Sequence, residues 1–210
     1  MPMSATAGTR ATITCRCGRC ALGLADGMPT MHILCGCEDC RQALQWGHAK
    51  GGARPDPLPS LHYMKSDIID IKGRDYMIAV KLREDGRSRR VYCRECHSVL
   101  GVDHPVYKDR VFMNYPKHCV TAGCLDVPVS LMLFMHDYPS ELGPVPEERV
   151  PVFQSLRFVQ EQDRLRLIEG IANCWFKERE QPPVGMTFTA LIASLGETLV
   201  LNLPRGERVS

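Results

Sequence analysis

Cys15-Arg16-Cys17-Gly18-Arg19-Cys20 is the first of three cysteine clusters that decide the fold of this chain. The other two are Cys35-Gly36-Cys37-Glu38-Asp39-Cys40 and Cys93-Arg94-Glu95-Cys96, so eight of the 11 cysteines lie in three short runs. Thiolates one or two residues apart reach the same metal ion because a tight turn brings both sulfurs to one side, and Zn²⁺ binds them at about 2.3 Å. The spacing therefore predicts metal sites.

The clusters must be divided among metal ions, because a Cys-x-x-Cys run alone supplies two of the four ligands of a tetrahedral site. The first and third clusters together offer a closed set of four sulfurs: Cys15, Cys17, Cys93 and Cys96. A closed tetrahedral shell is typical of structural zinc, whose binding energy contributes directly to folding. We therefore expect one structural zinc that ties the start of the chain to a later hairpin.

The second cluster leaves Cys35, Cys37 and Cys40 for another ion. Three protein ligands and an open fourth position are what a catalytic zinc needs. Cys37 and Cys40 stand at the predicted start of a short helix, where backbone N–H groups and the helix dipole favour thiolates. These three cysteines are the predicted catalytic residues, and the chain is expected to bind two zinc ions.

Composition limits the classes of protein to consider. The 210 residues carry a net charge of +2 with pI near 8.0, which makes nucleic-acid binding an unfavoured function. We expect the densest basic stretch, residues 87–90, to be a solvated turn before a strand. No secretory signal or membrane-spanning segment is predicted. Many unpaired thiols favour a reducing compartment, so a cytoplasmic location is expected, with the nucleus as the alternative.

The pattern of apolar residues predicts a mainly β chain. Residues 1–10 are expected to form a flexible tail, and residues 11–138 a zinc-binding β domain of short strands separated by turns. The strands are expected at 12–24 (a pair around the first cluster), 30–34, 61–64, 68–71, 77–82, 89–92, 111–114 and 131–135, with a helix at 38–46.

Residues 139–151 form a predicted Pro/Glu-rich linker, and residues 152–210 a mixed α/β extension. Apolar residues recur near helical period over 152–177, a short helix is expected at 187–195, and a last strand at 198–203. This apolar extension is also the expected surface of a homodimer.

The cysteine pattern resembles the glutathione-dependent formaldehyde-activating enzymes, a family that includes centromere protein V. The matching stretches are 14–18, 35–41 and 90–96, within a resemblance that covers residues 10 to about 138. It implies an Mss4-like arrangement of small twisted antiparallel sheets pinned by zinc. It also implies a carbon–sulfur lyase-type activity on a thiol–aldehyde adduct such as S-hydroxymethylglutathione, with glutathione as co-substrate and Arg41 and His48 as candidate cationic contacts.

The chain departs from this family in several places. Cys20 is an additional sulfur that offers a different ligand set, and His97 stands where the family usually has Gly. Cys119 and Cys124 follow His118 in a weak metal-ligand pattern, although packing in a loop is the default expectation.

Alternatives to the enzyme stay open at this point. They are a zinc-stabilised protein-binding module without catalytic activity, a metal or redox sensor that uses Cys20 and the second cluster, and an iron–sulfur protein. A fourth ligand position facing solvent would favour the enzyme, and one filled by a protein ligand would favour the binding module.

Overall fold

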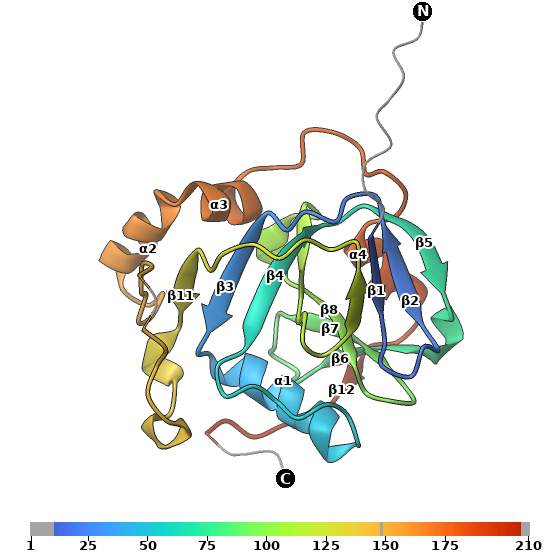
Figure 1. The fold of residues 1–210 in the computed structure, drawn as a ribbon, viewed down its shortest axis with the longest axis horizontal. Coiled ribbons are helices and arrows are strands. Elements are labelled where there is room, and N and C mark those ends of the chain that lie inside the picture. The colour runs from blue at the N-terminus through green and yellow to red at the C-terminus, as the bar shows by residue number, and fades with distance from the viewer. Residues whose placement is uncertain (1–10, 148, 207–210) are drawn as a thin grey trace, which may run out of the picture.

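The computed structural model describes residues 11–147 and 149–206, and it is mostly β, with two sheets and few helices (Figure 1). The predicted tail at residues 1–10 and the last residues of the predicted extension, 207–210, lie outside the described residues.

The smaller sheet has four antiparallel strands in the order β10-β1-β2-β5. Its bounds are β1 Ala11–Thr14, β2 Ala21–Leu24, β5 Ile68–Lys72 and β10 Val120–Ala122. The turn between β1 and β2 carries the first cysteine cluster, which confirms the predicted strand pair around it.

The larger sheet has eight strands in the order β11-β3-β4-β9-β8-β7-β6-β12. Its inner pairs are antiparallel, whereas β11 joins β3 and β12 joins β6 in parallel. The bounds are β3 Met31–Cys35, β4 Ser60–Lys65, β6 Met77–Lys81, β7 Arg89–Cys93, β8 Val99–Asp103, β9 Val111–Asn114, β11 Leu131–Leu133 and β12 Leu199–Val200. Neither β8 nor β10 was predicted from the sequence.

Helices are short and lie outside the sheets. They are α1 Glu38–Ala49, α2 Val159–Arg166, α3 Glu169–Ile171, a π-helical turn Ala172–Phe176, α4 Phe188–Ser194, and the 3-10 turns Arg74–Tyr76, Pro105–Tyr107, Met135–Asp137 and Ser140–Leu142. The α1 helix runs past its predicted end, because Gly47 leaves room for the carbonyl of His97, which a Cβ would meet at 2.9 Å. No helix among the described residues is long and apolar enough to cross a membrane.

Two main apolar cores fill the molecule, and the C-terminal residues belong to both. Phe153, Leu165 and Trp175 pack in the core that contains Cys35 and Cys40. In the other core, Phe188 of α4 stacks on Phe112 of β9 with ring centroids 4.5 Å apart and planes 6° from parallel. The segment after residue 152 therefore covers both faces of the larger sheet.

Candidate metal centres

The first centre joins the two sheets. Cys15 and Cys17 lie at the turn after β1, Cys93 ends β7, and Cys96 lies in the turn that follows β7. The four sulfurs lie within 4.8 Å of one another. The Sγ atoms of Cys15 and Cys17 are 3.5 Å apart, and those of Cys17 and Cys93 are 3.7 Å apart. A tetrahedron with Zn–S bonds of 2.3 Å has sulfurs about 3.8 Å apart. The four free thiols are therefore spaced as ligands of one metal ion.

Backbone turns hold these sulfurs in place. Gly18 has φ +74, and its N–H donates to the carbonyl of Cys15 at 2.9 Å. His97 adopts the left-handed conformation with φ +50, and its N–H donates to the carbonyl of Cys93 at 3.0 Å. The left-handed turn is therefore formed by His97, which has a Cβ, and not by a glycine. For such a residue the left-handed conformation costs about 1–2 kcal/mol. The His97 ring packs edge-on against Trp46, with centroids 5.6 Å apart.

Three further cysteines were considered as metal ligands: Cys20, Cys119 and Cys124. They do not form a metal centre of their own among the described residues. Cys20 is fully buried, and its backbone N–H donates to the Sγ of Cys15 at 3.3 Å. The sulfur of Cys20 is not part of the group of four. Cys119 is buried and its thiol donates to the carbonyl of Val99 at 3.0 Å. Cys124 is half-buried, with its sulfur 3.9 Å from the carbonyl of Thr12.

The second centre lies where β3 passes into α1. Cys35 ends β3, Cys37 is the N-cap residue of α1, and Cys40 lies in the first turn of that helix. The three sulfurs lie within 4.8 Å of one another, and the Sγ of Cys37 accepts the N–H of Cys40 at 3.3 Å. Gly36 is required between the first two, because a Cβ there would come 2.6 Å from the carbonyl oxygen of Phe134.

Contacts among the three thiols distribute charge unevenly. Hydrogen bonds from Cys35 and then Cys37 hold the pKa of Cys40 well below its usual range, with further help from Tyr115 and Arg90. Contact with Cys37 and Cys40, together with burial, raises the pKa of Cys35 well above its usual range. The group therefore favours negative charge on at least one sulfur, which is the state that a metal ion requires.

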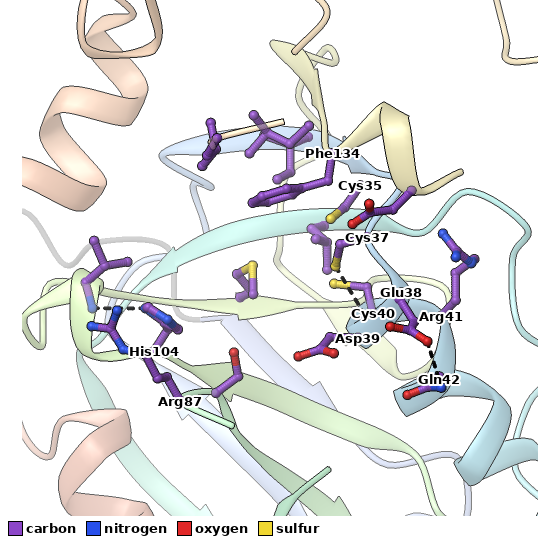
Figure 2. Close-up of a pocket in the computed structure, with 18 of the residues that line it drawn as sticks. Cys35, Cys37, Glu38, Asp39, Cys40, Arg41, Gln42, Arg87, His104 and Phe134 are labelled. Atoms are coloured by element: carbon purple, nitrogen blue, oxygen red, sulfur yellow. Dashed lines mark hydrogen bonds between the residues drawn. The ribbon is translucent and has the colours of Figure 1, made fainter. Parts of the chain in front are cut away.

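A cavity of about 1020 Å³ opens beside the three cysteines. Figure 2 shows their sulfurs gathered on one side of this pocket, with Arg87 and His104 on the other side in this view. Arginines from distant parts of the chain also line it: Arg41, Arg87, Arg90, Arg157, Arg166 and Arg205. Four carboxylates, those of Glu38, Asp39, Asp137 and Glu141, share the lining. The wall is thus rich in cations that suit an anionic ligand.

Arg90 is the least expected residue of this wall. Its side chain is 2% exposed, although residues 87–90 were predicted to form a solvated turn; for Arg90 that prediction is wrong. Burial follows from its place in β7, an inner strand of the larger sheet, with its guanidinium beside Asp39 of α1.

The guanidinium of Arg90 makes two long hydrogen bonds, to the carbonyls of Ser88 at 3.4 Å and Asp39 at 3.5 Å. None of the ion pairs within the described ranges includes it. The carboxylate of Asp39 pairs with Arg83 instead, at 2.6 Å. A buried charge without a close partner is costly. The negative charge of the neighbouring thiolates is the compensation that the site offers.

Of the two predicted cationic contacts, one lies at the site. Arg41 lines the cavity and donates to the carbonyl of Gly36. His48 does not line it: its ring is exposed on the last turn of α1 and bonds the carbonyl of Gly52 at 3.1 Å. The prediction for His48 is wrong because His48 lies eleven residues beyond Cys37 along α1, at a rise of about 1.5 Å per residue.

No protein-family model matches the chain, and no curated protein matches it. The two cysteine groups, which could hold metal ions, therefore carry the functional argument on their own geometry.

Proposed function

We propose that the protein is a zinc-dependent carbon–sulfur lyase-type enzyme that acts on a thiol–aldehyde adduct such as S-hydroxymethylglutathione. One observation carries the proposal: Cys35, Cys37 and Cys40 converge at the wall of a cavity of about 1020 Å³. Within the described part of the chain, no fourth Cys, His, Asp or Glu ligand atom joins them. A three-ligand site beside a large cavity is what a substrate-binding metal needs.

The residues present fit two zinc ions per chain. Cys15, Cys17, Cys93 and Cys96 would hold the structural ion, and Cys35, Cys37 and Cys40 the second. Three thiolates around a divalent ion carry a net charge of about −1, and the buried Arg90 supplies an opposite charge beside them. A zinc ion in this site would keep the thiol of a bound substrate ionised near neutral pH.

The chain's own side chains would then bind and orient the adduct. Glutathione has two carboxylates, and Arg87, Arg157 and Arg205 line the cavity from three different segments. Guanidinium groups bind carboxylates through paired hydrogen bonds, which fix orientation as well as position. The N–H of Val106 donates to Nδ1 of His104 at 3.1 Å, so neutral His104 carries its proton on Nε2, where it can donate to a substrate oxygen.

The proposed reaction balances without a redox partner. In the direction of adduct formation, the sulfur of glutathione bonds to the carbonyl carbon of formaldehyde as the C=O π bond opens. The proton lost by the thiol equals the proton gained by the new hydroxyl oxygen. In reverse, the C–S bond breaks and the same atoms are returned.

The test measures glutathione binding by calorimetry and the exchange of formaldehyde with its glutathione adduct by NMR. We expect wild type to bind glutathione and to accelerate exchange above the spontaneous rate, and Cys37→Ser to lose both. Cys124→Ser is the matched control, because its sulfur belongs to neither centre. Binding and exchange that are unchanged in Cys37→Ser would overturn the proposal.

A protein-binding module is the second candidate, and exposed apolar residues of the C-terminal segment favour it. Phe158, Val159 and Leu167 are 59%, 64% and 86% exposed. The same surface is where we propose a homodimer, for which light scattering of the full chain is the measurement. Together with the enzymatic activity, we propose an Mss4-like arrangement of the sheets and a cytoplasmic location.

A further inference from the structure

A pair of histidines occupies the sheet face opposite the cavity. His32 of β3 and His62 of β4 are directly opposed in the antiparallel register, with ring centroids 4.6 Å apart. Their neighbours Ile33 and Leu61 point into the core beside the cysteine cavity, so the alternation of a strand turns both imidazoles the other way. The pair is therefore separate from the second cysteine centre.

A carboxylate completes the group. The segment between β10 and β11 crosses β3 and β4 (Figure 1) and places Asp126 over the two rings. Oδ1 of Asp126 lies 3.7 Å from Nε2 of His62, and the ligand atoms of all three residues lie within 4.8 Å of one another. The side chain of Asp126 is 93% exposed, so the group opens to solvent on that side.

Hydrogen bonding orients His32 for metal binding. Its Nδ1 lies 2.7 Å from the carbonyl of Val127, which can only accept, so Nδ1 carries the proton. Nε2 then carries the lone pair, which accepts from the hydroxyl of Ser60 at 2.8 Å, and a metal ion would take the place of that hydroxyl. A ring N–H donated to a backbone carbonyl is the usual outer support of a metal-binding histidine.

His62 is not explained by packing alone. It is 5% exposed, and its Nε2 has no hydrogen-bond partner within the described ranges. Burial, together with His32, lowers the pKa of His62 to about 4, so the ring is neutral at pH 7 and forms no ion pair with Asp126. A buried, unpaired ring nitrogen costs free energy unless a ligand satisfies it.

We propose that His32, His62 and Asp126 form a third metal site, which binds a first-row divalent transition metal with water in the remaining positions. Two imidazoles and one carboxylate suit Zn²⁺, Co²⁺ or Ni²⁺ better than Mg²⁺ or Ca²⁺. A bound ion would clip the segment between β10 and β11 to strands β3 and β4. This inference does not depend on the proposed enzymatic function.

The test titrates Ni²⁺ into the untagged full chain that holds two zinc ions, one in each cysteine centre, by calorimetry, with zinc content measured before and after. We expect wild type to take up one equivalent of Ni²⁺ without releasing zinc. Asp126→Asn, at an exposed position that leaves the fold intact, should weaken binding at least about tenfold, and His62→Gln should remove it. Asp75→Asn and His136→Gln are controls at exposed positions outside the group and should bind as wild type does.

Two results would overturn the proposal. One is the absence of Ni²⁺ uptake by wild type, and the other is uptake that Asp126→Asn leaves unchanged. Because Asp126→Asn does not depend on a buried side chain, the second result stays interpretable even if His62→Gln fails to fold.

Discussion

Cys37 combines two roles that a single substitution can separate. Its sulfur is one of the three in the second centre, and it also caps α1 by accepting the N–H of Cys40 at 3.3 Å. Serine is among the best N-cap residues, so Cys37→Ser removes the thiolate and keeps the cap. Cys37→Ala removes both. Cys37 is half-buried, so neither change opens a large void in the core.

The expected magnitudes follow from these contacts. Both variants should contain one zinc per chain where wild type contains two. Loss of an N-cap costs about 1 kcal/mol, so Cys37→Ala should be less stable than Cys37→Ser by that amount, or about 2–4 °C in Tm for a domain of this size. Both should remain folded, because the ion between the two sheets stays in place.

Zinc content by elemental analysis and urea unfolding followed by circular dichroism are the measurements. If Cys37→Ser loses both ions and unfolds, the second centre is structural and the division between the two centres is wrong. If it keeps both ions, Cys37 is not a ligand. Equal stability of the Ser and Ala variants would refute the capping argument.

Three further outcomes are expected. Cys93→Ser should lose the structural ion and unfold, because apparent zinc binding energies of about 10–16 kcal/mol exceed most domain stabilities. Zinc content and circular dichroism measure this, and a folded variant with one zinc would contradict it. Gly101→Ala should lower the free energy of unfolding in urea by about 1–3 kcal/mol, since its Cβ would lie 2.7 Å from Phe188 and 2.8 Å from Phe112. An unchanged urea midpoint would mean that the stacked rings can shift. Burial lowers the pKa of His118, so the unfolded chain binds more protons below pH 6.5 and stability falls as pH falls through that range. His118→Gln should flatten this dependence of Tm on pH, and an unaltered profile would exclude His118 as its source.

Local sequence predicted the parts of the structure that depend on near neighbours. The cysteine spacing predicted the sulfurs that lie together within each cluster, because residues two or three apart in a turn or first helical turn are close in any fold. That Cys15 and Cys17 meet Cys93 and Cys96 was predicted from the need for four ligands, and the meeting itself depends on how the two sheets pack. Apolar alternation predicted most strands, and the capping geometry at Cys37 fits the predicted start of α1. By contrast, β8 and β10 were missed, since Val99–Asp103 is buried throughout and shows no alternation, and Val120–Ala122 is short and mostly exposed.

Sequence alone determined which cysteines could be ligands and that the chain is mainly β. Tertiary structure decided what surrounds them. The burial of Arg90 beside Cys40, the arginines that meet around the cavity, and the group of His32, His62 and Asp126 all join segments far apart in the chain. No local pattern marks such contacts, because strand register and the path of a crossing loop depend on how the whole sheet packs.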